Sequence, residues 1–289
     1  MSQIEIKNLS YIYSYGTCME KKAINNVSVN MNKGEFIGLI GRTGSGKSTF
    51  IKQLNGLLKP SKGTILLDGE NIWKEPKKIR DVRFKVGLVF QYPEHQLFEE
   101  TVYKDIAFGP TNMGLYSQEI NERVYDAICF VGLSQELLNK SPFELSGGEK
   151  RRVAIAGVIA MDPEVLILDE PTAGLDPQGR EQLLTQINKY HKEKGKTVIL
   201  VSHNMEDIAS FADKVMVLND GKLVKFGTTK SVFSNPNELE QIGLQVPQIT
   251  RIMSCLKDEV PEMGDGILTV DEGIKEILKV ISKRRNINA

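Results

Sequence analysis

The sequence predicts an α/β fold in which a mostly parallel sheet carries an inserted helical subdomain and a small helical C-terminal extension. The sheet is predicted from short runs rich in Val, Ile and Leu, several almost wholly apolar, as in strands buried on both faces. These runs lie at residues 4–6, 35–40, 86–90, 165–168, 197–201 and 215–218. Between residues 90 and 165 the apolar residues follow helical spacing, most clearly at 121–131 and 150–161. This change predicts a helical subdomain at about residues 92–164, inserted between two core strands.

The strand pattern ends at about Thr228, so we predict one large domain over residues 1–228 and a helical extension over 229–289. Prolines divide the extension into short helical pieces. Two pieces carry a one-sided apolar stripe, formed by Ile249, Ile252, Met253 and Leu256 and by Ile274, Ile277, Leu278 and Ile281. Thr269, followed three residues later by Glu272, predicts the start of the second helix.

Short amphipathic helices of this kind are unstable alone and must bury their stripes on another surface. That surface is either the chain's own large domain or a partner. We favour a partner, and therefore predict that the extension is a dimerisation element.

Composition and charge exclude several classes of function. The 289 residues include 37 basic and 37 acidic side chains, so no overall field would recruit nucleic acid or an anionic membrane. The longest apolar run, residues 153–161, is half of the roughly 20 residues that a membrane span needs, and the N-terminus has no signal-peptide core. The odd number of cysteines, 3, without metal-ligand spacing fits a reducing cytoplasm. We expect any membrane contact to go through another protein.

Residues 41–48 match G-x-x-x-x-G-K-[ST], directly after an apolar strand and before a helical run at 49–58. This is the context of a phosphate-binding loop and predicts a P-loop NTPase. Its glycines let backbone N–H groups point at the phosphates, while Lys47 reaches the β- and γ-phosphates and Ser48 binds Mg²⁺. The predicted nucleotide-binding residues are Gly41, Arg42, Thr43, Gly44, Ser45, Gly46, Lys47, Ser48 and Thr49. The loop alone does not separate a kinase, a GTPase, a helicase or a transporter subunit.

The apolar strand at 165–168 is followed by two carboxylates, Asp169 and Glu170. The carboxyl edge of the sheet places both beside the phosphate loop. Asp169 is expected to bind Mg²⁺, and Glu170 to polarise the attacking water. The alternative is a strand end with two solvated acids.

Two further polar residues follow core strands and reach the same edge of the sheet. His203 follows the strand at 197–201, and strand order delivers it beside Asp169 and Lys47. Gln91 ends the strand at 86–90 and could sense Mg²⁺ or water through its side-chain amide. We predict catalytic roles for Glu170, His203 and Gln91.

A second anion-binding surface is predicted at residues 145–149, Leu-Ser-Gly-Gly-Glu, which open a helix. Ser146, Gly147 and Gly148 at a helix start favour an anion. One nucleotide does not need two such surfaces in one chain. We therefore predict that this surface closes over a nucleotide held by another subunit, so that two cassettes meet head to tail.

Together these residues strongly resemble the ABC ATPase family over residues 1 to about 230. The matching segments are the Walker A loop at 41–48, the Q-loop at Gln91, the signature at 145–149, the Walker B strand at 165–170, the D-loop at 174–177 and the switch histidine His203. The resemblance implies an ABC-type nucleotide-binding domain that hydrolyses ATP with Mg²⁺ to drive transport, with Asp176 of the D-loop near the nucleotide. Glu149 replaces the usual Gln, and we expect the closing surface to be retained.

The resemblance also implies an aromatic residue stacked on adenine near the N-terminus. By position Tyr13 is our choice. Tyr11 and Tyr15 remain alternatives, and any of the three could instead pack inside the domain.

A narrower resemblance is to the second of the two ATPases of energy-coupling factor (ECF) transporters, carried by residues 54–60, 89–102 and 105–110 and by the extended tail. It implies uptake of vitamins or transition-metal ions, pairing with a homologous ATPase, and a shared transmembrane scaffold that joins a substrate-binding membrane subunit. The chain would then sit peripherally on the cytoplasmic face of the cell membrane. Tyr92, Leu97 and Phe98 are predicted to contact the scaffold, the alternative being packing within the helical subdomain.

Three alternatives differ in their expected sequence features. The ATPase of a conventional ABC importer is the runner-up. ABC ATPases that act on DNA or ribosomes would carry a long coiled-coil insertion or two cassettes, which this sequence lacks. A non-enzymatic regulatory cassette should have lost Glu170, His203 or the signature glycines, and all are present.

Overall fold

The computed structural model describes residues 2–287 of the 289-residue chain. Its centre is a six-stranded sheet in the order β10-β9-β3-β8-β7-β6, in which all neighbours are parallel except β10 and β9. The strands are β3 (Phe36–Ile40), β6 (Val86–Val89), β7 (Val165–Asp169), β8 (Thr197–Val201), β9 (Lys214–Asn219) and β10 (Lys222–Thr228). Each of β3, β6, β7 and β8 is buried along its whole length. The predicted strands at 35–40, 86–90, 165–168, 197–201 and 215–218 are therefore confirmed.

A separate antiparallel sheet has the order β2-β1-β4-β5. Its strands are β1 (Ser2–Tyr13), β2 (Lys21–Asn32), β4 (Lys62–Leu67) and β5 (Glu70–Asn71). The sequence pattern predicted only residues 4–6 of this sheet, and it did not predict β10. These strands alternate buried and exposed residues, because one face packs on the core and the other meets solvent. Polar residues therefore interrupt the apolar runs by which the parallel strands were recognised.

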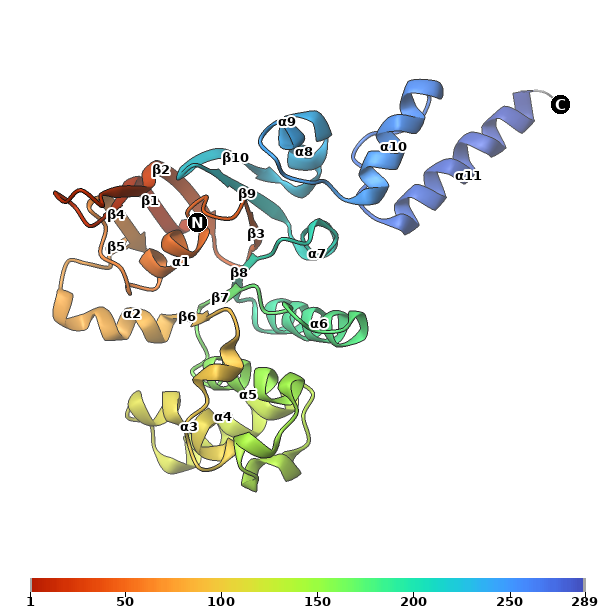
Figure 1. Cartoon of the computed structure of the whole chain (residues 1–289). Coiled ribbons are helices and arrows are strands. Elements are labelled where there is room, and N and C mark those ends of the chain that lie inside the picture. Colours follow the sequence, from red (N-terminus) through yellow and green to blue (C-terminus); the bar gives the residue numbers. More distant parts are fainter. Residues whose placement is uncertain (1, 288–289) are drawn as a thin grey trace.

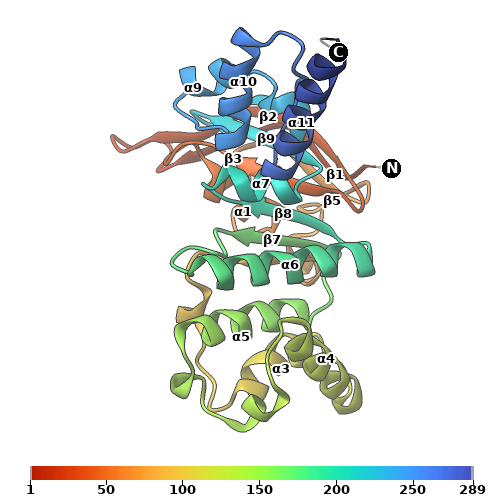
Figure 2. The ribbon, with the colours of Figure 1, turned by 90° about the vertical axis from the view of Figure 1, so that its right-hand side faces the viewer.

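The helices lie around this core and below it (Figures 1 and 2). A lower layer holds α3 (Val102–Asn112), α4 (Ser117–Phe130) and α5 (Gly147–Ile159), in agreement with the helical segments expected at 121–131 and 150–161. Next to the sheets lie α1 (Lys47–Leu54), α2 (Ile79–Lys85), α6 (Pro177–Lys194) and α7 (Met205–Phe211). The expected helix at 49–58 is shorter than predicted, because Gly56 adopts a left-handed φ of 71°.

The C-terminal extension forms α8 (Thr229–Phe233), α9 (Pro236–Gln241), α10 (Gln248–Glu259) and α11 (Val270–Ile287). Figures 1 and 2 show α10 and α11 projecting beyond the sheets. They share a small core of Met253, Met263, Ile267 and Val280. Thr269 accepts a hydrogen bond from the Glu272 N–H at 3.3 Å, as expected at the start of α11.

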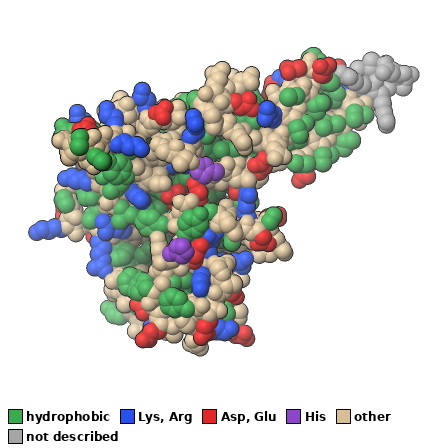
Figure 3. Space-filling view, in the orientation of Figure 1, with side chains coloured by type: hydrophobic (Ala, Val, Ile, Leu, Met, Phe, Trp, Pro, Cys, Tyr) green, Lys and Arg blue, Asp and Glu red, His purple; other side chains and the backbone are tan. Residues whose placement is uncertain are grey.

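The apolar stripe of α11 lies largely on the surface. Val270, Ile274, Leu278 and Ile281 are 62%, 50%, 57% and 44% exposed, and hydrophobic side chains gather along this helix in Figure 3. On α10, Ile252 is also exposed, whereas Met253 is buried. The chain's own domain therefore covers only part of the two stripes.

Candidate functional site

The phosphate-binding loop between β3 and α1 turns through left-handed backbone, with φ of 82° at Gly44 and 102° at Gly46. Such turns direct successive N–H groups into one concavity. A Cβ on Gly46 would lie 2.5 Å from the Ala23 carbonyl oxygen, and one on Gly41 would lie 2.3 Å from that of Leu218. Glycine is therefore required at both positions, because the loop packs directly on β2 and β9.

The interior of this loop fits a chain of phosphates. Lys47 is buried, and its Nζ donates hydrogen bonds to the carbonyl oxygens of Gly41 at 2.6 Å and Arg42 at 3.1 Å. Burial lowers the pKa of Lys47, while the nearby charges of Glu170 and Asp169 raise it. The buried Ser45 hydroxyl has no hydrogen-bond partner among residues 2–287. A buried cation and an unpartnered hydroxyl are groups that phosphate oxygens would satisfy.

Asp169 ends β7 beside the loop. Burial raises its pKa, and a hydrogen bond with the Ser48 side chain lowers it. Hydroxyl and carboxylate oxygens are ligands that Mg²⁺ accepts. Within residues 2–287, no group of three or more His, Cys, Asp or Glu side chains could hold a metal by itself. Ser48 and Asp169 are thus residues that would hold a magnesium ion together with phosphate oxygens and water.

The three predicted catalytic residues meet at one carboxylate. Glu170 Oε1 lies 2.7 Å from His203 Nε2, and Oε2 accepts a hydrogen bond from Gln91 Nε2 at 3.1 Å. Glu170 itself has a left-handed φ of 52°, and its N–H donates to the Val201 carbonyl at 3.0 Å. A non-glycine residue in this conformation costs about 1–3 kcal/mol and persists only where its surroundings impose it. The chain accepts this strain at the carboxylate that could orient a water molecule.

Tyr13, the predicted adenine contact, lies beside the first turn of α1. Its hydroxyl is 3.1 Å from Thr49 Oγ1, and its ring meets that of Tyr11 edge to face at 4.8 Å. Tyr13 is 38% exposed, and Tyr15, in the hairpin turn beyond it, is 77% exposed. A stacking role for Tyr13 stays a prediction, with a position next to the loop in its favour.

The signature residues lie away from this cluster. Ser146 caps α5 and exchanges hydrogen bonds with Glu149, whose Oε2 accepts from the Ser146 N–H at 2.8 Å and from its Oγ at 2.7 Å. These bonds lower the pKa of Glu149. A Cβ on Gly147 or Gly148 would meet no atom within 4 Å. In Figures 1 and 2, α5 lies below β7 and α1 above it, so the structure does not bring the signature to its own phosphate loop.

Asp176 is likewise not joined to the loop. It is exposed and caps α6, where its Oδ1 accepts a hydrogen bond from the Gly179 N–H at 3.3 Å. No hydrogen bond or ion pair within residues 2–287 links it to residues 41–49. Its predicted place near a nucleotide stays a prediction that a second subunit would have to fulfil.

Arg151 is a residue whose role the sequence analysis missed. It is buried in α5, and its guanidinium binds both carboxylate oxygens of Glu94, at 2.7 and 3.0 Å. It also donates to the carbonyl oxygens of Pro171 and Ala173. Arg151 thus ties the signature helix to the segment after Gln91 and to the loop after Glu170. Only its place in a charged run was visible in the sequence, and such a run usually marks a solvated helix end.

A second ion pair fixes the element that follows His203. Arg180 of α6 donates from Nε to both oxygens of Asp207, at 2.9 and 3.0 Å, and from Nη2 at 2.7 Å. Burial raises the pKa of Asp207, and the charge and hydrogen bonds of Arg180 lower it. The pair holds α7, and with it the His203 loop, against α6.

With this geometry in place, comparison with known proteins identifies the family. The pattern of the ABC transporter family matches residues 24–173. A protein from Caldanaerobacter subterraneus subsp. tengcongensis, the energy-coupling factor transporter ATP-binding protein EcfA2, is 52% identical over 284 residues, which cover 98% of this chain and 99% of that one. The protein of the same description from Clostridium perfringens is 54% identical over 279 residues, 96% of this chain and 98% of that one.

The chain belongs to the ABC transporter family, among its ECF-type ATP-binding proteins. It is an ATP hydrolase, as the resemblance to the ABC ATPase family implied, and its relatives confirm the narrower resemblance to ECF transporter ATPases. Among solved structures, CbiO1 from Clostridium perfringens, described as part of the ABC transporter complex CbiONQ, superposes with a TM-score of 0.74 at 39% identity, covering 88% of this chain and 99% of that one. The ATP-binding cassette MJ0796, solved as a dimer bound to ADP and Pi, superposes with a TM-score of 0.71 at 28% identity. The match covers 78% of this chain and 98% of that one.

No helix in the described part of this ABC ATPase is long and apolar enough to cross a membrane. Its three cysteines, Cys18, Cys129 and Cys255, are exposed and form no disulfide with one another. Nucleotide binding follows from the family, and the geometry above indicates which side chains would carry it.

Proposed function

We propose that this ATPase works as one half of a pair, in which each subunit's signature closes over ATP held by the other. The observation that carries the proposal is the unfilled space at Gly147 and Gly148. Glycine there is not required by the chain's own packing, in contrast to Gly41 and Gly46. The absence of side chains at these two positions would instead let an anion approach the backbone at the start of α5 closely. A phosphate group of a nucleotide held by a partner subunit fits this surface. The MJ0796 cassette, solved as a dimer bound to ADP and Pi, supports the pairing of two subunits.

Within each site, Lys47 and the loop amides hold the β- and γ-phosphates, and Ser48 and Asp169 bind Mg²⁺. Glu170 orients and deprotonates the attacking water, while His203 and Gln91 fix its carboxylate from either side. The magnesium ion, when bound, neutralises charge that develops on the phosphate oxygens. Tyr13 stacks on adenine, and Asp176 acts on the nucleotide across the pair.

The partner is a homologous ECF-type ATPase, giving a heterodimer, and the α10–α11 helices contribute to pairing. Their exposed stripe at Val270, Ile274, Leu278 and Ile281 supports this role, because the chain leaves it largely uncovered. The extension at 229–289 is then a dimerisation element appended to an ATPase domain at 1–228.

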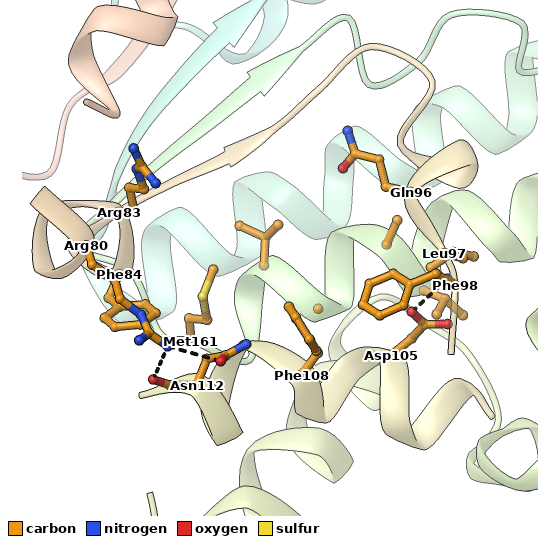
Figure 4. Close-up of a pocket in the computed structure, with 15 residues that line it drawn as sticks. Arg80, Arg83, Phe84, Gln96, Leu97, Phe98, Asp105, Phe108, Asn112 and Met161 are labelled. Carbon is orange, nitrogen blue, oxygen red and sulfur yellow. Dashed lines mark hydrogen bonds between the residues drawn. The ribbon is translucent and has the colours of Figure 1, made fainter. Parts of the chain in front are cut away.

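Transport is coupled through a groove beside the Q-loop (Figure 4). The groove encloses about 490 Å³ between α2, residues 96–98, α3 and α5. At its rim Phe98 and Phe108 meet edge to face at 5.0 Å and are 59% and 48% exposed. Arg80 on the opposite side donates to the Asn112 carbonyl at 2.8 Å. An apolar groove edged by arginines fits a short amphipathic segment of a transmembrane scaffold.

Of the three residues expected to face the scaffold, Tyr92 and Phe98 are exposed, at 47% and 59%. Leu97 is half-buried and packs against the main core, so it supports the groove from within. The complex lies on the cytoplasmic face of the membrane and reaches its cargo, vitamins or transition-metal ions, through a substrate-binding membrane subunit joined to the scaffold.

Cross-linking tests this coupling. Gln96 lines the groove, and His95, the residue before it, is also exposed. Each is replaced by cysteine after the three natural cysteines are changed to serine. Adducts with the scaffold are expected from both positions in the purified complex, and none from a control cysteine at exposed Lys33. Absence of adducts from positions 95 and 96 in every nucleotide state would overturn the proposed docking.

A further inference from the structure

Residues 242–248, which comprise the linker after α9 and the first residue of α10, connect the ATPase core to the two C-terminal helices. Leu244 and Val246 are buried in the main core, which they share with Met205 of α7. The Gln248 N–H donates to Glu206 Oε1 at 3.3 Å. This hydrogen bond is with the helix that follows His203, so the segment is anchored close to the catalytic edge of the sheet.

The same segment touches the phosphate-binding loop. A Cβ on Gly243 would lie 3.0 Å from Cδ, 3.1 Å from Nε and 3.3 Å from Cζ of Arg42. The Arg42 side chain therefore lies directly over this glycine. Gly243 has a left-handed φ of 73°, and its N–H donates to the Glu240 carbonyl at 2.9 Å in the turn that ends α9.

Arg42 is a cation with unused hydrogen-bonding capacity. Its guanidinium makes no hydrogen bond or ion pair with any residue in the described range 2–287. Its backbone carbonyl, by contrast, accepts a hydrogen bond from Lys47 Nζ at 3.1 Å. Contact with Gly243 restricts the conformations of the Arg42 side chain. The guanidinium therefore loses less conformational entropy when its N–H groups bind an anion.

We propose that Gly243 positions Arg42 for the nucleotide, so that the segment 242–248 acts as part of the phosphate cradle. The proposal rests on the assignment of residues 41–48 as that cradle. Linkage between two sites is reciprocal. A nucleotide that binds Arg42 must therefore also change the conformational equilibrium of the segment and of the α10–α11 helices that follow it. The C-terminal extension would then respond to ATP within its own chain.

A pair of glycine variants isolates this contact. Gly243→Ala adds a Cβ against Arg42, whereas Gly266→Ala adds one at the same φ of 73° with its nearest neighbour, Lys230, 3.8 Å away. Both variants carry the same backbone strain, so Gly266→Ala is the matched control. In the purified complex, Gly243→Ala should raise the KM for ATP about fivefold with little change in kcat, a coupling of ordinary size for neighbouring residues. Gly266→Ala should leave the KM for ATP within about twofold of that of the unaltered complex, because Gly266 does not contact Arg42.

The role of Arg42 is tested in a double-variant cycle. In an Arg42→Ala background, Gly243→Ala should have no further effect on the KM, because the side chain that it displaces is gone. Thermal melting of each variant separates lost positioning from lost folding. If Gly243→Ala is too unstable to assay, hydrogen exchange of α10 in the unaltered complex and in Arg42→Ala, with and without ATP-Mg²⁺, gives a second test.

The proposal is supported if ATP changes exchange in α10 of the unaltered protein and not in Arg42→Ala. It is overturned if the two glycine variants change the KM equally, if their effects persist without Arg42, or if α10 responds to ATP in both proteins. Failure of the unaltered complex to bind ATP at all would instead contradict the assignment of the cradle.

Discussion

The chain has two glycine-rich helix starts, and they differ in what their glycines serve. At the start of α1, a Cβ on Gly41 or Gly46 would come within 2.3 or 2.5 Å of backbone oxygen atoms of the same chain. At the start of α5, Gly147 and Gly148 have no neighbour within 4 Å. Both starts can bind an anion. The first is shaped by its own chain, whereas the second is shaped for something outside it.

The surrounding charges show the same difference. Lys47, Asp169 and Glu170 converge beside the first helix start. Burial lowers the pKa of Lys47, and the charges of Glu170 and Asp169 oppose that shift. Burial also raises the pKa of Asp169, and the charge of Lys47 opposes it. At the second, the Glu149 carboxylate satisfies the donors of Ser146 within the helix cap. This difference supports our proposal that the first start holds a whole nucleotide with its metal and that the second contacts only part of one.

The largest expected effect comes from Glu170→Gln. Loss of the water-orienting carboxylate should lower ATP hydrolysis at least about 100-fold, while ATP binding is retained because the cradle is unchanged. Both helix starts should then stay closed on ATP, and ATP-bound pairs should accumulate in size-exclusion chromatography. Hydrolysis within a few-fold of the unaltered complex would refute the role of Glu170.

Lys47→Ala should act at the first helix start alone. Removing a cation that bonds to phosphate is expected to weaken ATP binding about 10- to 100-fold, the range for charged hydrogen bonds. Equilibrium binding of a fluorescent ATP analogue measures the change. Arg152→Ala, which removes a half-buried cation near the second start, is the control and should leave ATP binding to the isolated chain unchanged.

Alanine at the two sets of glycines separates folding from pairing. Gly41→Ala should lower the free energy of unfolding by about 1–3 kcal/mol, because the methyl group is forced against the Leu218 carbonyl. Gly147→Ala should change it by no more than about 0.5 kcal/mol, as at other unhindered surface positions. Urea unfolding of both variants measures the two changes. Equal destabilisation would contradict the claim that packing within the chain requires glycine at position 41 but not at position 147.

A small effect is expected from the ion pair between Glu94 and Arg151, which joins the signature helix to the segment after Gln91. Burial raises the pKa of Glu94, but the hydrogen bond and charge of Arg151 outweigh it, and the folded-state pKa lies below the usual value. The pair therefore stabilises the fold above the unfolded-state pKa of about 4.3. That contribution is lost as the pH falls through the lower folded-state value. Glu94→Gln should cost about 1 kcal/mol at pH 7.

Urea unfolding at pH 7 and at about pH 3 measures this pH dependence, since the lower pH protonates most carboxylates. The difference between Glu94→Gln and the unaltered chain should shrink at the lower pH. A difference that is the same at both pH values would show that the charge of Glu94 contributes nothing.

The sequence predicted the parallel strands and the cluster at their carboxyl ends because topology alone brings Lys47, Asp169, Glu170 and His203 to one edge. It did not predict β2 or β4, whose half-exposed faces interrupt the apolar pattern. Nor did it reveal Arg151, whose burial depends on contacts with segments 57 and 22 residues away. Side chains that act through tertiary contacts leave no periodic signal in the chain.

The central claim is that the second helix start acts on the nucleotide of a partner. ATP-dependent pairing with the related ATPase, measured by analytical ultracentrifugation for Glu170→Gln with and without Gly147→Ala, tests it most directly. The account predicts that Gly147→Ala leaves folding and ATP binding by the isolated chain intact but lowers the ATP-bound pair at least about tenfold, because a methyl group would stand where the phosphate must approach. Undiminished pairing with Gly147→Ala would contradict the account.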